Sequence, residues 1–318
     1  MNEIPGREDI ERAHHLIAPY IHNTPVLTSQ SFDSLTGCNV FFKCENFQKA
    51  GAFKSRGAVH AVMTLPGEST RAGVATHSSG NHAQALARAA SLRKIPAYVV
   101  MPSNAPAVKV RAVEQYGGQI TFCEPSLAAR ESTLAGLITR TGASEIHPYN
   151  DYRIIAGQAT AALEFIRQVP DLDIIIVPVG GGGLLSGSLL SCRYWSPKTA
   201  VIAAEPEKAN DAYLSFRERK FVPSVNPDTI ADGLKTSLGS LTFPIIMQYV
   251  HDILTTGEGA IIHATRWIWE RMKIVIEPSA AVPVAVLLEN AQRMSGKRIG
   301  IIISGGNADL HKLLWNQP

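Results

Sequence analysis

Lys54 is the residue of this chain whose surroundings most favour covalent chemistry. It stands between Phe53 and Ser55, in a segment expected to form a loop that opens a helix. A lysine amine in such a position can form a Schiff base with a carbonyl compound. Far downstream, the apolar segment 174–179 leads into four consecutive glycines, residues 180–183. Consecutive glycine N–H groups at the start of a helix can converge on an anion such as a phosphate.

A reactive lysine together with a phosphate cradle indicates pyridoxal 5′-phosphate (PLP). Two rival nucleotide motifs do not fit the sequence. The G-x-G-x-x-G spacing fails because Leu185 stands where a Gly or Ala is required, and no G-x-x-x-x-G-K-[ST] segment occurs. The sequence therefore disfavours a nucleotide-dependent oxidoreductase and a P-loop enzyme.

Two further loops of small polar residues follow predicted strands. One is Thr-His-Ser-Ser-Gly-Asn-His at 76–82, and the other is Ser-Gly-Gly-Asn at 304–307. The first could cap a helix or could present hydroxyl and N–H groups to a carboxylate, and its spacing leaves both readings open. Ligands of open α/β sheets bind at the carboxyl ends of the strands. The glycine run and these two loops therefore predict one shared cleft.

Alternating strand and helix patterns carry these loops. Near-continuous apolar strands separated by helices indicate an α/β fold with mostly parallel, buried sheets. The length of 318 residues suggests about two domains. We expect a discontinuous large domain (1–68 and 148–318) and a small domain (69–147). Strands are expected at 40–43, 73–76, 97–101, 119–123, 174–179, 200–204 and 299–303; helices are expected at 8–20, 58–65, 83–91, 108–116, 126–139, 156–169 and from 184 onward.

Composition argues against several classes of protein. The formal net charge is +3 and no basic run interleaves with aromatic residues, so no nucleic-acid partner is expected. The longest apolar runs, 174–179 and 280–288, fall far short of the roughly 20 residues that span a bilayer. The N-terminus lacks an apolar signal region, so a cytoplasmic location without membrane contact is expected. The four cysteines form no C-x-x-C pair and are expected to be buried thiols, and no cluster suited to catalytic zinc occurs.

Several motifs resemble a known family, the serine racemase and serine/threonine dehydratase family of fold-type II PLP enzymes. The resemblance covers nearly the whole chain and implies a tryptophan synthase β-like fold with two domains. The motifs that carry it are Phe47-Gln48-Lys49-Ala50-Gly51-Ala52-Phe53-Lys54, the loop at 76–82, Val177-Pro178-Val179 with the glycine run, Ala203-Ala204-Glu205-Pro206, Glu270-Arg271-Met272-Lys273, Ile276-Glu277-Pro278 and the loop at 304–307.

The resemblance also implies how PLP is held. Lys54 would bind it covalently, Phe53 would pack beside its ring, and Asn81 would bond the ring 3′-oxygen. Ser304 would face the pyridine nitrogen. The phosphate would lie on the glycine run, which consists of Gly180, Gly181, Gly182 and Gly183.

Substrate, metal and effector residues follow from the same resemblance. Ser79 would be a second acid and base on the ring face opposite the lysine. The positions near the substrate are Ser78, Ser79, His82, Arg130 and Thr236. From the residues alone, the acidic segment 205–211 is better explained as solvated surface charge. The resemblance reverses this and implies a site for Mg²⁺ (or Ca²⁺ or Mn²⁺) at Glu205, Asp211 and the Ala209 carbonyl. Gln84 and Lys273 match positions around an ATP effector site, and a homodimer is implied.

The implied reaction is PLP-dependent dehydration and deamination of a small 3-hydroxy amino acid to a 2-oxo acid and ammonia. Serine, threonine and 3-hydroxyaspartate stay open as substrates, and Arg130 suits a second carboxylate. The alternative is a serine racemase with side dehydratase activity, and from another class a non-catalytic ligand-binding protein. Two departures from the racemase pattern are Ala83 in place of Gly and the segment 149–151 after His-Pro.

Overall fold

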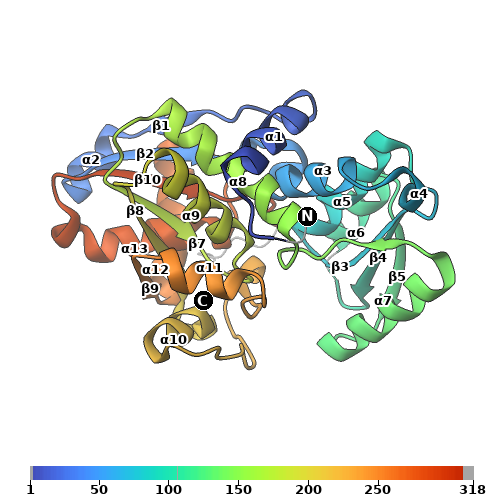
Figure 1. Ribbon diagram of the computed structural model, residues 1–318. Helices are drawn as coiled ribbons and strands as arrows, with labels where there is room; N and C mark the ends of the chain where they lie inside the picture. Colours follow the sequence, from blue (N-terminus) through green and yellow to red (C-terminus); the bar gives the residue numbers. More distant parts are fainter. Residues whose placement is uncertain (1–2, 106, 311–318) are drawn as a thin grey trace.

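The computed structural model describes residues 3–105 and 107–310, which form two sheets flanked by helices. Figure 1 shows the larger sheet on the left of the view and the smaller sheet on the right. The strand order of the larger sheet is β1 (Val26–Thr28), β2 (Asn39–Cys44), β10 (Arg298–Ile303), β7 (Ile174–Pro178), β8 (Ala200–Pro206) and β9 (Asp252–Thr256). The order of the smaller sheet is β5 (Gln119–Cys123), β4 (Ala97–Pro102), β3 (Val74–His77) and β6 (Ser144–Glu145).

All neighbouring strands are parallel except at the edge of the larger sheet, where β1 runs antiparallel to β2. Strand β10, the last one within the described residues, lies between β2 and β7, with Ile301 opposite Phe42 on one side and Ile176 on the other. The expected α/β fold with mostly parallel sheets is confirmed.

Helices cover both faces of the larger sheet, which explains why its central strands are apolar throughout. One face packs on α8 (Tyr152–Gln168), α9 (Gly183–Trp195), α10 (Asp211–Glu218) and α11 (Thr242–Tyr249). The other face packs on α2 (Gln30–Thr36), α12 (Glu258–Trp267) and α13 (Pro278–Met294). Short helical turns complete this part: η1 (Ala18–Tyr20), η2 (Glu45–Phe47), η3 (Lys49–Gly51), η4 (Glu207–Ala209), η5 (Asp232–Leu234) and the π-helical η6 (Ile268–Met272).

The smaller sheet has its own core. One face packs on α3 (Lys54–Met63), α5 (Asn81–Arg93) and α6 (Ala107–Gln115), and the other packs on α7 (Leu127–Thr141). The remaining helices are α1 (Arg7–Ile17), which contacts α8, and the short α4 (Gly67–Thr70). All four strands of this sheet lie within the predicted small domain, whereas α3 precedes it in the chain. The boundaries at residues 68 and 148 stay a prediction.

Three of the four cysteines are buried, and Cys123 is only half-buried, because it lies on the edge strand β5. All four are free thiols in the part of the chain that the structure describes. None of the helices described is both long and apolar enough to span a membrane.

Two glycines bring α3 against α8. A Cβ on Gly157 would lie 2.6 Å from the Cα of Gly57 and 2.8 Å from the carbonyl oxygen of Arg56. No side chain larger than hydrogen fits at this crossing, so the two helix backbones touch. The first turn of α3, which begins at Lys54, is therefore fixed on the long helix α8.

Four buried charges lie beside this crossing. Arg56 is fully buried and donates to Glu45 at 2.7 and 2.8 Å and to Glu164 at 2.7 and 2.8 Å. Lys43 donates to Glu164 at 2.9 Å and to the carbonyl oxygen of Thr24 at 2.8 Å. Two cations and two carboxylates leave this charge network neutral overall. It ties β2, η2, α3 and α8 together.

We expect Arg56→Met to destabilise the fold by about 3–5 kcal/mol, because it leaves two buried carboxylates without their main partner. The free energy of unfolding from urea titration measures this. Arg167→Met is the matched control, because Arg167 pairs with Glu11 at the surface and such pairs contribute about 0–1 kcal/mol. Equal losses in the two variants would contradict the importance of the network.

Candidate active site

Lys54 stands at the first position of α3, where the chain passes the end of strand β10. The backbone N–H of Phe53 donates to the carbonyl oxygen of Ser304 at 3.0 Å, and Ala52 forms a β-bridge with Gly305. The Lys54 Nζ donates to the Pro148 carbonyl at 2.8 Å and lies 5.2 Å from the ring centre of Phe53. Burial lowers the pKa of Lys54 to about 8, against the opposing effect of the Glu277 carboxylate. A substantial fraction of this amine is neutral near pH 8.

The glycine run connects β7 to α9 and is buried. Gly182 is the N-cap of α9 with φ of 89°, a backbone angle that favours glycine. A Cβ on Gly180 would lie 2.9 Å from the Cα of Leu234, and a Cβ on Gly181 would lie 2.3 Å from the Tyr149 ring. The four N–H groups of the run donate to no other described residue. The loop therefore offers unpaired donors at a helix N-terminus, which suits a phosphate.

Asn81 begins α5 and is held by two side chains. Its Nδ2 donates to Glu277 Oε1 at 2.8 Å, and its Oδ1 accepts from Asn307 Nδ2 at 2.8 Å. Asn307 also donates to the Ala50 carbonyl at 2.8 Å. Because the amide oxygen is already occupied, the second N–H of Asn81 is left for a ligand oxygen. Ser304 is buried at the end of β10. The loops at 76–82 and 304–307 thus meet, as the shared-cleft prediction requires.

Glu277 accepts the hydrogen bond from Asn81 in the candidate site, although sequence reasoning left it without a role. It is the N-cap of α13, and its Oε1 would lie 2.6 Å from a Cβ on Gly305. Burial raises the pKa of Glu277 to about 8, and the charge of Asp232 adds to this. At neutral pH the carboxyl is largely protonated. The only signal in the sequence was one carboxylate standing between Ile276 and Pro278.

The loop before α5 contributes serines and a histidine. Ser78 Oγ accepts from the N–H of Gly80 at 3.3 Å, and Ser79 beside it is half-buried. His82 Nε2 donates to the Ile146 carbonyl at 3.0 Å. Burial lowers the pKa of His82 to about 3, so the ring is neutral.

Arg130 and Thr236 belong to elements that pack on different sheets. Arg130 lies on α7 over the smaller sheet, and Thr236 lies just after η5. Burial lowers the pKa of His77, and the positive charge of Arg130 lowers it further. A hydrogen bond from Thr236 acts on the Tyr149 phenol. Both predicted residues therefore border the segment that contains Tyr149, which sequence reasoning did not assign to the site.

Glu205 and Asp211 are buried and lie close enough to repel each other. Glu205 accepts from the N–H groups of Ala212 and Tyr213 at 2.9 and 2.8 Å. Burial, followed by the charge of Asp211, raises the pKa of Glu205 well above its usual range. Burial raises the pKa of Asp211 to about 6, against the opposing effect of hydrogen bonds from Ser224 and from the backbone of Leu238. Two buried carboxylates beside the turn that ends at Ala209 suit a hard cation.

Glu205 and Asp211 alone provide too few side-chain ligands for a complete metal site. No group of three or more His, Cys, Asp or Glu side chains in residues 3–105 and 107–310 could hold a metal ion. A cation here would therefore need backbone carbonyl oxygen and water as further ligands, such as the Ala209 carbonyl.

The predicted effector residues, Gln84 and Lys273, lie on different elements. Gln84 is buried in α5, whereas Lys273 is exposed after η6 with φ of 61°. No hydrogen bond joins them within the described part of the chain.

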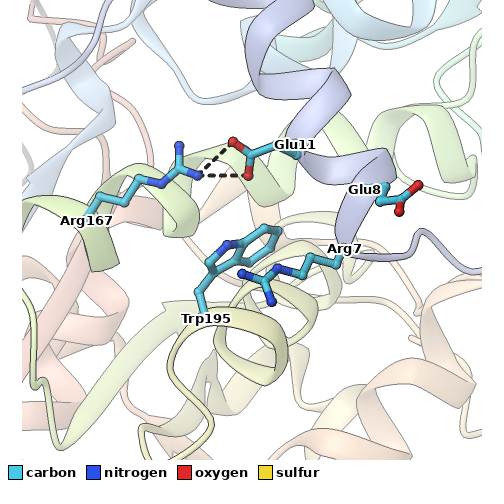
Figure 2. A pocket seen from close by; sticks show the side chains of 5 residues that line it. All are labelled: Arg7, Glu8, Glu11, Arg167 and Trp195. Carbon is cyan, nitrogen blue, oxygen red and sulfur yellow. Dashed lines mark hydrogen bonds and ion pairs between the residues drawn. The ribbon is translucent and has the colours of Figure 1, made fainter.

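A surface hollow elsewhere is not the active site. Figure 2 shows this hollow, where Arg7 stacks at 5.4 Å over Trp195 and Arg167 pairs with Glu11. Its remaining lining residue is Glu8, and none of the predicted site residues reaches it.

Comparison with known proteins decides the family. The profile described as "Pyridoxal-phosphate dependent enzyme" matches residues 17–305. The chain belongs to this family. It is therefore a PLP-dependent enzyme, as the lysine and the glycine run predict.

Three relatives are similar to this PLP-dependent enzyme over nearly its whole length. A beta-hydroxyaspartate dehydratase of Paracoccus denitrificans (strain Pd 1222) is 50% identical over 98% of this chain and 99% of its own. A serine racemase of Dictyostelium discoideum is 48% identical over 96% of both chains. The solved structure of maize serine racemase matches with a TM-score of 0.95 and 45% identity, over 98% of this chain and 96% of that chain. The predicted resemblance to serine racemases and dehydratases is confirmed.

The residues present fit PLP. The buried N–H groups of the glycine run suit its phosphate. The Lys54 amine donates to the Pro148 carbonyl, and the next residue, Tyr149, packs on Gly181 of the run. The second N–H of Asn81 suits a ring oxygen, and the Ser304 hydroxyl is a neutral partner for a ring nitrogen.

The buried carboxyl of Glu277 predicts a pH-dependent difference between the wild-type apoprotein and Glu277→Gln. The folded-state pKa is raised to about 8, so the wild-type carboxyl favours folding at low pH and loses that contribution as pH rises toward 8. Glutamine does not titrate. The stability of the variant relative to wild type should therefore rise between about pH 4.5 and pH 8 and level off above that.

Urea unfolding of both apoproteins at a series of pH values measures this difference. The difference isolates Glu277 from Glu205 and Asp211, which titrate in both proteins. A difference that does not vary with pH would show that Glu277 is ionised in the folded state.

Proposed function

We propose that this enzyme dehydrates and deaminates a small 3-hydroxy amino acid, giving a 2-oxo acid and ammonia. The observation that carries the proposal is the Lys54 amine, partly neutral and 2.8 Å from the Pro148 carbonyl, in a cleft with an unpaired glycine cradle. The 50% identity to a beta-hydroxyaspartate dehydratase supports the same reaction class.

In this proposal Lys54 holds the cofactor and moves the proton. When bound, PLP supplies an electron sink for the electron pair of the substrate Cα–H bond. Lys54 Nζ would hold it covalently, and the amine, when free, would accept the proton from the substrate Cα. Hydroxide then leaves from Cβ, and the enamine product hydrolyses to the 2-oxo acid and ammonia.

The remaining site residues bind and orient in this proposal. Phe53 would pack beside the cofactor ring, Asn81 would donate to its 3′-oxygen, and Ser304 would face its nitrogen. The neutral state of Glu277 supports the role of Asn81, because the carboxyl accepts from Asn81 without placing a full negative charge beside the ring. Ser78 and His82 border the substrate.

Serine racemisation is the second candidate, and Ser79 favours it. A hydroxyl on the ring face opposite Lys54 could return a proton to Cα and give the opposite enantiomer. The identity to serine racemases supports this candidate as well. We place elimination first because the relative with the highest identity among those compared is a dehydratase.

We also propose a divalent cation, Mg²⁺ or a similar hard ion, at Glu205, Asp211 and the Ala209 carbonyl. The support is the burial of two carboxylates side by side, Glu205 and Asp211, whose charges repel each other without a cation. The two domains would divide at residues 68 and 148, and the enzyme would work as a cytoplasmic homodimer. An ATP effector near Gln84 and Lys273 stays a prediction from resemblance.

Product analysis tests the function. Purified enzyme with PLP and Mg²⁺ is given each stereoisomer of serine, threonine and 3-hydroxyaspartate, and the 2-oxo acid and the opposite enantiomer are both quantified. We expect 2-oxo acid to dominate. Lys54→Ala should lose the absorption of lysine-bound cofactor and fall by about a thousandfold or more in rate, since Lys54 is both anchor and base. A dominant enantiomer from serine would reverse the order of the two candidates.

Cation binding is tested by thermal unfolding. Mg²⁺ should raise the melting temperature of the wild type by a few degrees at pH 8, because a ligand that binds only the folded state stabilises it. The effect should shrink at pH 5, since the raised pKa of Asp211, about 6, means that protons then compete with the metal. Asp211→Asn should abolish it. Asp228→Asn, an exposed carboxylate that pairs with Lys208, is the control and should keep it.

A further inference from the structure

The glycine run has great conformational freedom for a segment that must hold a phosphate. Residues 180–183 carry no side chains that could restrict the backbone, and a peptide unit between two glycines rotates with little steric resistance. Such a loop binds an anion well only if its N–H groups already point toward it, because ordering the loop on binding costs conformational entropy. Contacts from outside the run must therefore orient its peptide units.

Helix α9 orients the last of these units. The N–H of Ser186 donates to the Gly182 carbonyl oxygen at 2.8 Å, which closes the first turn of the helix. In a trans peptide unit the carbonyl and the N–H point in opposite directions. The N–H of Gly183, which shares a peptide unit with that carbonyl, therefore points out of the helix N-terminus, where the helix dipole favours an anion.

The side chain of Thr242 orients the unit before it. Thr242 is fully buried at the start of α11, and its Oγ1 donates to the Gly181 carbonyl oxygen at 2.8 Å. A longer contact, 3.3 Å, reaches the same oxygen from the N–H of Gly239. Both donors lie on the α11 side, so the N–H of Gly182 in the same peptide unit points away from α11. Neither this N–H nor that of Gly183 donates to another residue within the described ranges.

Thr242 is itself held in a tight turn. Its Oγ1 accepts from the N–H of Gly239 at 2.8 Å and lies 3.2 Å from the carbonyl oxygen of the same residue. The Asn150 side chain holds the turn from outside, since its Oδ1 accepts from the N–H of Leu241 at 2.8 Å and its Nδ2 donates to Ser240 Oγ at 3.1 Å. The hydroxyl is thus fixed in place and donates along its shorter contact, to the glycine run.

Gly182 packs directly on this side chain. A Cβ on Gly182 would lie 2.8 Å from Thr242 Oγ1 and 2.7 Å from Ile246 Cδ1. The φ of 89° at Gly182 also favours glycine. A loop that cannot carry a side chain at this position gains its order from the neighbouring hydroxyl instead.

We propose that Thr242 is a positioning residue for the cofactor phosphate. By holding the Gly181 carbonyl, it points the N–H of Gly182 into the phosphate cradle beside the N–H of Gly183. The inference rests on the PLP cofactor of the family and on the glycine run as its phosphate site. It does not depend on which reaction the enzyme catalyses.

The test compares wild type with Thr242→Val and Thr242→Ser, each as the full-length protein loaded with PLP or with pyridoxal, which lacks the phosphate. Valine keeps the volume and removes the hydroxyl, whereas serine keeps the hydroxyl. Thr265→Val is the matched control, because Thr265 is also buried and donates to the Ile261 carbonyl at 2.8 Å within α12, on the other face of the larger sheet. The dissociation constant of each complex is measured from the absorption of lysine-bound cofactor on dilution.

Thr242→Val should weaken PLP binding about tenfold, the size expected when a hydrogen bond that supports binding to a charged group is lost, and should change pyridoxal binding less than about twofold. Thr242→Ser and Thr265→Val should keep the wild-type values for both ligands. Equal losses for PLP and pyridoxal would mean that Thr242 only supports the fold. Unchanged PLP binding would mean that the Gly181 carbonyl needs no anchor, and either result would overturn the proposal.

Asn150→Ala is the second variant, in case Thr242→Val does not fold. It removes the amide that holds the turn and leaves the Thr242 hydroxyl in place. PLP binding should then weaken while pyridoxal binding stays unchanged, and equal effects on the two ligands would count against the proposal. Because no substrate is present, failure of the proposed elimination reaction would not alter these affinities.

Discussion

The rest of the structure depends on the neutral network of Arg56, Lys43, Glu45 and Glu164. Charges this deeply buried are stable only with their partners in place. Arg56 is two residues after Lys54, so the same contacts that satisfy its guanidinium also set the start of α3. The glycine contact between α3 and α8 leaves that helix little room to shift. The neutral charge network and the contact between α3 and α8 therefore fix the position of Lys54.

In the candidate site, unlike in the charge network, burial favours the neutral forms of the titratable side chains. Burial lowers the pKa of Lys54 and raises the pKa of Glu277, each to about 8. It also keeps His82 and His147 neutral. A site with few fixed charges of its own lets the charges of the bound molecules dominate the interactions.

Much of the fold could be read from local patterns. Apolar runs identified β2, β4, β7 and β10, because strands buried on both faces are apolar throughout. The segment between β8 and β10 was largely missed. Strand β9 reads Asp-Ile-Leu-Thr-Thr, which is half polar because it lies at the sheet edge. Helix α13 contains Pro283 in its interior, a residue that normally argues against a helix. Helix α3 was expected from residue 58, yet it begins at Lys54. The burial of the Glu277 carboxyl and the packing of the Tyr149 ring on Gly181 could not be predicted, because both depend on tertiary contacts.

The central place of β10 has a consequence for how the protein is made. In the finished sheet β10 lies between β2 and β7, and it leaves the ribosome after the other five described strands of that sheet. Until then both strands expose unpaired backbone edges, which are prone to wrong pairing. Ser304 and Asn307 follow β10 directly, so the cofactor cleft also lacks one wall during synthesis. Most of the chain must therefore wait, partly folded, for residues 298–303, and the protein acquires its larger sheet and its catalytic cleft in the same late step.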